Sequence, residues 1–265
     1  MVLSVLTYRL ANEGSVYIFG GISVYIMFLS LVLIITVAMA VIGGQRVIKL
    51  SKTSVSERFS TKLKCGTYYQ ILGGLWGATV VVLIVCFVVG VNLIDIGFRS
   101  ISFNYGFWFT TVTLVLSGLL FAYGLRNLIS SLVSAKFREA VEQQTENSIL
   151  SAIIPRNKKE RQIFVFLSFS AGVCEEIIYR GFLLFALWGM FPDIPIVLIV
   201  LIQSILFGIS HLYQGIQGII MTAVVGAIFM CLFSVTNSLI MPMVLHFFVD
   251  FTNTFLLSEK EIKYA

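Results

Sequence analysis

Charged residues are scarce in this sequence. Of its 265 residues, 12% are Asp, Glu, Lys or Arg, about half the share found in soluble domains, whereas 58% are apolar. A water-soluble globule of this size cannot cover its surface with so few charges. The apolar excess therefore has to face lipid, and the chain is long enough for several spans of about 20 residues each. This composition excludes a soluble protein and indicates a polytopic membrane protein.

The sequence also lacks the alternating polar and apolar segments of a membrane β-barrel. Its apolar runs are long and unbroken, and helices satisfy their backbone hydrogen bonds within such a run. The four cysteines are widely separated without a Cys-x-x-Cys pair, so neither a disulfide framework nor a zinc knuckle is indicated. The net charge of +5 comes with no nucleic-acid-binding motif, and we expect no nucleic-acid partner. The predicted fold class is all-α, a polytopic helical bundle.

Three apolar runs contain no Asp, Glu, Lys, Arg or His and predict membrane spans: 17–43, 71–94 and 107–125. The later apolar region is interrupted by prolines and an asparagine and predicts four more: 163–190, 194–212, 214–234 and 238–257. The expected total is about seven helices, within a range of six to eight. The first 15 residues show no signal-peptide pattern, so the first span is expected to be retained.

Basic residues are concentrated in two loops, 44–67 and 126–162, whereas the loop 95–106 holds only Asp95 and Arg99. By the positive-inside rule, the two basic loops are cytoplasmic. We therefore expect a multi-pass protein of a bacterial cell membrane, with the N-terminus outside and the C-terminus in the cytoplasm.

Ionisable side chains are rare between residues 163 and 257, and lysine is absent there. Asp193 falls in a predicted turn. The other six lie within apolar segments and include both histidines of the chain: Glu175, Glu176, Arg180, His211, His246 and Asp250. A charge at mid-membrane costs roughly 2.5–3.5 kcal/mol, and the first three spans show that this chain can do without charge. We interpret the six side chains as one functional site.

The spacing of these residues suggests different roles. Glu176 and Arg180 are four residues apart with the acid first, which favours an ion pair within one helix. Glu175 points about 100° away from Glu176 and has no basic partner on its own helical face, so it is a candidate general base. His246 and Asp250 are also four residues apart, so the carboxylate can orient the ring.

Three motifs follow one another in successive apolar segments. They are Glu-Glu-x-x-x-Arg at 175–180, Phe-x-x-x-His at 207–211 and His-x-x-x-Asp at 246–250. Together they resemble the CAAX protease and bacteriocin-processing (CPBP, or ABI) family of intramembrane proteases, which includes the type II CAAX prenyl endopeptidases. The resemblance covers about 163–257 and implies an active site between the four C-terminal helices.

What the resemblance implies is a glutamate-type endopeptidase in which Glu175 and His211 activate a water for attack on the scissile carbonyl. His246 with Asp250 would stabilise the oxyanion. Members of the family carry Asn or Asp at this last position. Because an ionised Asp cannot donate a hydrogen bond to an oxyanion, we assign Asp250 chiefly to orienting and charging His246. The remaining motif residues would support the site: Glu176, Arg180 and Phe207.

The apolar spans and the resemblance together predict the organisation of the chain and its partners. We expect N-terminal transmembrane helices over 1–135, a cytoplasmic segment over 136–162, a catalytic core over 163–257 and a cytoplasmic tail over 258–265. The segment before the core could be an amphipathic helix on the membrane interface or a solvated linker helix. Expected partners are membrane lipids and membrane-associated, including lipidated, peptides or proteins, with processing of CAAX-type, pheromone or bacteriocin precursors, or bacteriocin self-immunity, as candidate roles.

Several alternatives remain beside this interpretation. No cofactor is expected, although Glu175, His211 and His246 could in principle hold zinc and leave a water position open. Cys174 is a poor nucleophile beside two carboxylates. The protein could also be a non-proteolytic scaffold or immunity protein, or a proton-coupled transporter, because intramembrane acids and histidines mark proton paths too.

A further expectation concerns the depth of Glu175 and His211 in the membrane. A straight helix from residue 163 would place Glu175 about 18 Å along its axis, whereas His211 falls close to the cytoplasmic end of its own span. We predict that residues 163–170 lie at or above the cytoplasmic interface, with the site in a water-filled cavity open to the cytoplasm.

Overall fold

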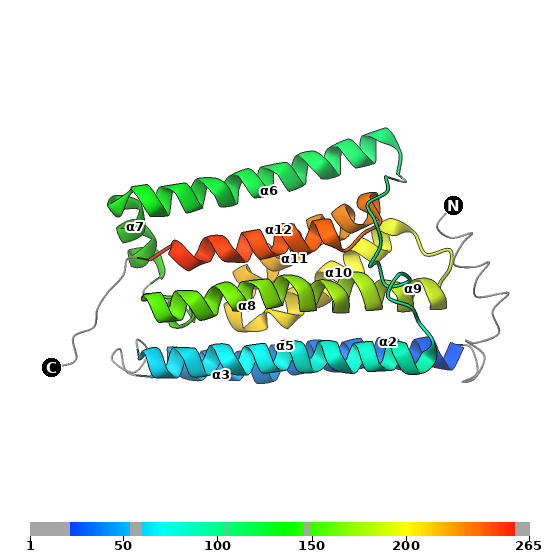
Figure 1. Ribbon diagram of the computed structural model, residues 1–265, viewed down its shortest axis with the longest axis horizontal. Coiled ribbons are helices and arrows are strands. Elements are labelled where there is room, and N and C mark those ends of the chain that lie inside the picture. The colour runs from blue at the N-terminus through cyan, green and yellow to red at the C-terminus, as the bar shows by residue number, and fades with distance from the viewer. Residues whose placement is uncertain (1–21, 54–59, 104, 146–148, 258–265) are drawn as a thin grey trace.

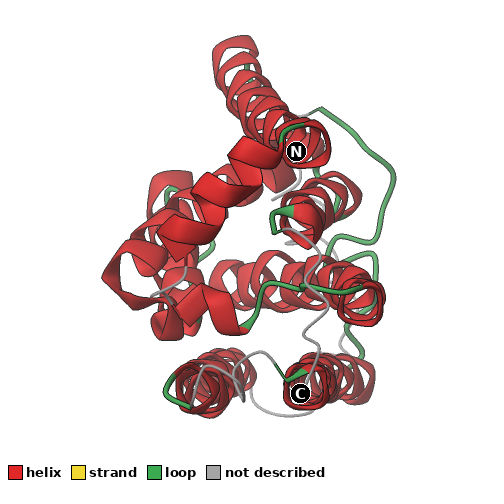
Figure 2. Ribbon diagram, turned by 90° about the vertical axis from the view of Figure 1, so that its left-hand side faces the viewer, coloured by secondary structure: helices red, strands yellow, loops and turns green. Residues whose placement is uncertain are grey.

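The computed structural model describes residues 22–53, 60–103, 105–145 and 149–257. Within these ranges the chain is helical, with no strand, and the longer helices lie side by side along the longest axis of the molecule (Figure 1). A view turned by 90° shows a bundle several helices deep (Figure 2). The predicted all-α helical bundle is confirmed.

Five helical segments of the described chain are long and apolar enough to cross a membrane. They are Val24–Val41, α5 (Thr61–Val89), α6 (Phe107–Val133), Lys158–Met190 and Leu212–Thr236. The first comprises most of α2 (Ile22–Ala38) and part of the π-helix η2 (Met39–Gly43), and the last comprises the 3₁₀ turn η5 (Leu212–Gln214) and α11 (Gly215–Thr236). Each overlaps a predicted span. The first 15 residues, the start of the first predicted span and the tail at 258–265 lie outside the described residues.

The two other predicted spans form shorter helices. Helix α10 (Ile196–Ser210) has 15 residues and α12 (Ile240–Thr252) has 13, so neither reaches the roughly 30 Å of a hydrocarbon core. Pro195 immediately precedes α10, and Asn237 ends α11 with a left-handed φ of 52°. The expected count of about seven thus becomes five full-length and two short helices among the described residues.

Helix α5 begins ten residues earlier than its predicted span, and it carries the buried Lys64. The Lys64 ammonium donates to the Ile154 carbonyl at 2.8 Å and lies 3.7 Å from the Glu160 carboxylate. Tyr68, one turn further on, donates to the Ile153 carbonyl. A charge can enter the helix here because an acid and a carbonyl compensate it.

The segment between the third and fourth spans forms α7 (Ala135–Thr145) and the 3₁₀ turn η3 (Ile149–Ala152). No residue of α7 is buried. Arg156 pairs with Glu142 at 2.7 Å and links α7 to the segment that leads into the next long helix. The short α3 (Gly44–Ser51), which directly follows η2, contacts η3.

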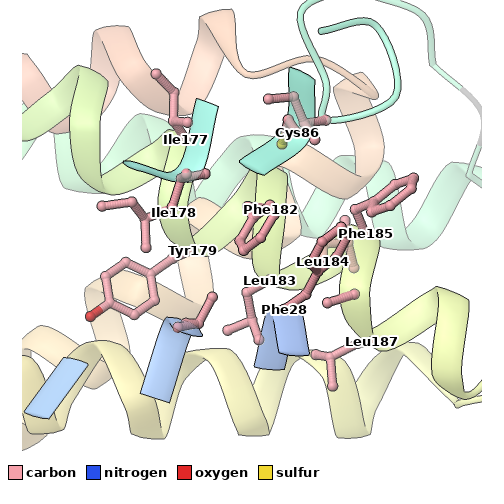
Figure 3. Close-up of a cluster of buried hydrophobic side chains, with 14 of the residues drawn as sticks. Phe28, Cys86, Ile177, Ile178, Tyr179, Phe182, Leu183, Leu184, Phe185 and Leu187 are labelled. Carbon is pink, nitrogen blue, oxygen red and sulfur yellow. The ribbon is translucent and has the colours of Figure 1, made fainter. Parts of the chain in front are cut away.

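The helix Lys158–Met190 changes its winding in the middle. It consists of α8 (Lys158–Glu176), a π-helical segment η4 (Ile177–Leu183) and α9 (Leu184–Met190). All residues of η4 are buried, and its apolar side chains belong to the largest apolar cluster together with residues such as Phe28 and Cys86 (Figure 3). The Phe28 and Phe182 rings are 4.7 Å apart. This core packs α2 and the end of α5 against the segment that carries the first motif.

Candidate active site

The six ionisable side chains meet in one region of the bundle. Glu175 and Glu176 end α8, Arg180 lies in η4, His211 follows the last residue of α10, and the remaining two project from α12: His246 and Asp250. The π-helical winding begins directly after the two glutamates, and such segments in α-helices are frequent at functional sites. Asp193, by contrast, is exposed in the turn before α10, as predicted.

Glu176 is the centre of the polar contacts. Its Oε1 accepts a hydrogen bond from Arg180 Nη1 at 2.8 Å, and the predicted ion pair is therefore present. The same oxygen lies 2.8 Å from His246 Nδ1. Arg180 also donates from Nη2 to the Gly226 carbonyl of α11 at 3.0 Å. One buried carboxylate thus links α8, η4 and α12.

His246 is held differently from the sequence expectation. The sequence predicts that Asp250 orients the ring, but Asp250 Oδ2 lies 3.7 Å from Nε2, whereas the contact of hydrogen-bonding length is the one between Nδ1 and Glu176. Spacing along α12 could not reveal this partner, because Glu176 comes from another helix. A carboxylate only accepts, so Nδ1 carries the proton in this contact. Nε2 then faces Asp250 and Glu175, whose Oε2 is 3.9 Å away.

The Glu175 carboxylate is buried, and its Oε2 has no hydrogen-bond partner. An unsatisfied buried carboxylate oxygen is costly and calls for an explanation, which a reactive role supplies. The neighbouring Cys174 packs instead in the apolar contact between α8 and α5, away from both histidines. The Cys174 side chain thus lies among apolar residues, whereas that of the adjacent Glu175 lies beside His246.

His211 has its own set of contacts. Its Nδ1 lies 2.9 Å from the Phe207 carbonyl and 3.0 Å from Ser210 Oγ. A carbonyl only accepts, so Nδ1 carries the proton and Nε2 is the basic nitrogen. His211 and Glu175 both lie in the described part of the chain, and no hydrogen bond or ion pair joins them. The predicted pair would act together through a bound water or substrate.

Phe207 lies between the polar groups. Its ring centroid is 5.0 Å from the His211 ring and 5.8 Å from the His246 ring, and the Arg180 guanidinium stands 4.3 Å above it. Phe229 stacks on the other side of His246 at 4.9 Å, a contact that the sequence did not indicate. The face of the Phe207 ring stabilises the Arg180 guanidinium by a cation–π contact.

Two glycines permit the close approach of these helices. A Cβ at Gly172 would lie 2.9 Å from the backbone nitrogen of Phe247, so α8 and α12 touch one turn before the glutamates. A Cβ at Gly226 would lie 2.8 Å from the Phe207 ring and 3.2 Å from Arg180. A larger side chain at either position would move the helices that carry the site.

Metal binding was the alternative use of Glu175, His211 and His246. In the described part of the chain, no group of three or more His, Cys, Asp or Glu side chains has the arrangement of a metal site.

The model of one protein family, described as type II CAAX prenyl endopeptidase Rce1-like, matches residues 158–252. This range runs from the first residue of α8 to the last residue of α12 and contains all three motifs. Over these residues the chain is similar to the CAAX-type intramembrane proteases, a family whose activity is that of a peptidase. No curated protein and no solved structure matches the chain.

Proposed function

We propose that this protein is a glutamate-type intramembrane endopeptidase that hydrolyses peptide bonds in membrane-associated, including lipidated, substrates. The observation that carries the proposal is the buried Glu175 carboxylate, whose Oε2 lacks a hydrogen-bond partner and lies 3.9 Å from His246 Nε2. Amide hydrolysis needs a base for water, a donor for the oxyanion and an acid for the leaving amine. Glu175, His211 and His246 supply these groups.

In the proposed reaction, Glu175 takes a proton from water while His211 Nε2 accepts the hydrogen bond of the second water proton. The water oxygen attacks the scissile carbonyl carbon and forms a tetrahedral intermediate. Glu175 then returns its proton to the leaving amine as the C–N bond breaks. No metal or cofactor enters this scheme.

His246 is the proposed oxyanion donor. Both of its ring nitrogens face carboxylate oxygens, Nδ1 that of Glu176 and Nε2 those of Glu175 and Asp250. This arrangement suits the doubly protonated ring, which donates from Nε2 to a developing negative charge. In this proposal Glu176 and Arg180 hold the ring in place.

Comparing wild type with Glu175→Gln tests the proposal. The purified protein, in detergent or nanodiscs, is incubated with prenylated peptides ending in a CAAX sequence and with unmodified apolar peptides, and the products are identified by mass spectrometry. We expect cleavage by the wild type and a loss of about 10²- to 10⁴-fold in Glu175→Gln, as for a general base.

The matched control is Glu139→Gln on α7, the same change at an exposed position, which should cleave like the wild type. Equal activity in Glu175→Gln and wild type would reject the mechanism. Absence of cleavage of any peptide by the wild type, together with proton flux abolished by Glu175→Gln in liposomes, would favour the transporter alternative.

A further inference from the structure

The turn η5, directly after His211, carries a tyrosine that none of the three motifs includes. The centroid of the Tyr213 ring lies 5.9 Å from that of the His211 ring, with an angle of 32° between the two planes. Phe207 approaches the same His211 ring at 5.0 Å. The turn thus places a side chain with a polar tip beside one of the residues to which the proposed function assigns the activation of water.

Tyr213 lies on the accessible part of the site. The side chains of Glu175 and His246 are buried, whereas those of His211, Tyr213 and Asp250 are half-buried. A peptide that arrives from outside the protein can touch only side chains with exposed surface. It therefore meets the half-buried residues before it reaches Glu175.

The Tyr213 hydroxyl has one hydrogen-bond partner. It accepts a hydrogen bond from Gln214 Nε2 at 3.2 Å, and in the described part of the chain no residue accepts a hydrogen bond from it. A phenol hydroxyl can accept and donate at the same time. Its proton is therefore available to a ligand, and every peptide offers acceptors in its backbone carbonyl oxygens.

The N-terminal half of the chain helps to fix this turn. η5 packs against η2 and α3, which both lie outside the family match at 158–252. A Cβ at Gly44, the first residue of α3, would lie 2.9 Å from the Tyr213 Cβ. Gly215 follows the turn with a φ of 78°, a conformation that glycine adopts without strain. The place of the Tyr213 side chain therefore depends on the absence of a side chain at Gly44.

We propose that Tyr213 is a substrate-binding residue, whose hydroxyl donates a hydrogen bond to a backbone carbonyl of the peptide beside His211. This inference rests on the proposed function, in which the substrate is a peptide. Gln214 and Gly44 are the positioning residues of this contact. Because the acceptor belongs to the peptide backbone, the contact does not depend on the side chains or the lipid of the substrate.

Binding is measured in proteins that do not turn the peptide over, so both compared proteins carry Glu175→Gln. A dansyl-labelled prenylated peptide ending in a CAAX sequence is titrated with each protein in nanodiscs and followed by fluorescence anisotropy. We expect the added Tyr213→Phe to weaken binding by about 3- to 10-fold, the effect of one lost neutral hydrogen bond. Phenylalanine keeps the ring beside His211 and removes only the hydroxyl.

Thioamide peptides locate the contact. Each backbone carbonyl oxygen near the cleaved bond is replaced in turn by sulfur, a weaker hydrogen-bond acceptor. At one position this replacement should weaken binding to the Glu175→Gln protein, and it should have no further effect once Tyr213→Phe is added. Such non-additivity is the sign of a direct contact between the two changed groups.

Kinetics gives a third measurement in a preparation that cleaves peptide. Tyr213→Phe should raise KM by about 3- to 10-fold and leave kcat within about twofold, because a contact made equally in the bound substrate and the transition state changes KM alone. Gly44→Ala should raise KM in the same direction, since the new methyl group displaces the Tyr213 side chain.

Two matched controls make the same changes elsewhere. Tyr123 is exposed on α6, and a Cβ at Gly73 in α5 meets no atom within 4 Å. Tyr123→Phe and Gly73→Ala should bind and cleave the peptide like the wild type. Equal losses in these controls overturn the inference.

Equal peptide binding with and without Tyr213→Phe overturns it as well, and so does the absence of any peptide binding to the Glu175→Gln protein. A lower kcat at unchanged KM in Tyr213→Phe would place the hydroxyl in the transition state and reject the binding role. If the wild type cleaves no peptide, the proposed function fails, while the binding comparison still decides whether Tyr213 contacts a peptide.

Discussion

The two halves of this molecule both contain long apolar helices, but these helices differ in how many of their residues are buried. In α6, 17% of the spanning residues are buried, and the helix lies along one side of the bundle (Figure 1). In Lys158–Met190 the buried share is 61%, and the helix carries two glutamates and an arginine in its interior. A helix surrounded by lipid has nothing to compensate a charge, whereas a helix surrounded by protein can keep charges when its neighbours supply partners.

The largest expected difference between the halves concerns the buried arginine. Arg180→Met leaves Glu176 buried without its cation, and we expect a loss of about 3–5 kcal/mol in the free energy of unfolding. Arg126→Met removes an exposed arginine of α6 and should change stability by no more than about 0.5 kcal/mol. Denaturation in detergent, followed by the loss of helical signal, measures both.

A double variant sharpens this test. Replacing both partners, Glu176→Leu with Arg180→Met, removes the charge pair as a unit and should be less harmful to stability than Arg180→Met alone. Similar losses in Arg180→Met and Arg126→Met would contradict the distinction between buried and lipid-facing helices.

The second difference concerns helix contacts. Gly172→Ala places a methyl group 2.9 Å from the backbone of α12, and the resulting strain should cost about 1–3 kcal/mol. A Cβ at Gly118 in α6 meets no atom within 4 Å, so Gly118→Ala should be neutral or slightly stabilising. Thermal unfolding midpoints compare the two. Equal midpoints would mean that α8 and α12 separate easily.

A smaller effect is expected at the third motif. Asp250→Asn should keep activity within about threefold, because Glu176 holds His246 and the new amide can donate to an oxyanion. Peptide cleavage measures the effect, with Asp193→Asn in the exposed turn as the control. A loss of about 100-fold in Asp250→Asn would show that the negative charge beside His246 is essential.

The smallest expected effect is that of chelators. Incubation with 1,10-phenanthroline or EDTA should leave peptide cleavage within about twofold of the untreated enzyme, because the proposed reaction uses side chains alone. Loss of activity that added zinc restores would instead favour the metal site of Glu175, His211 and His246.

The sequence predicted the membrane helices well, because apolar length and the absence of charge are local properties. It also singled out the residues that come together, since a charge in an apolar segment is conspicuous. The partners of these residues were harder to predict. The pair of Glu176 and Arg180 follows from helical spacing, but the contact of Glu176 with His246 joins α8 and α12, and that of Thr36 with Tyr179 joins α2 and η4.

The sequence by itself determined that this is a helical membrane protein and which six ionisable side chains require an explanation, because inserting each of them into lipid is costly. The tertiary structure decided which of these side chains contact one another. It placed Glu176 rather than Asp250 at hydrogen-bonding distance from His246, left Glu175 Oε2 without a hydrogen-bond partner and brought Thr36 of α2 to the Tyr179 hydroxyl. These contacts depend on where helices approach closely, at positions such as Gly172, and spacing along a single helix carries no information about them.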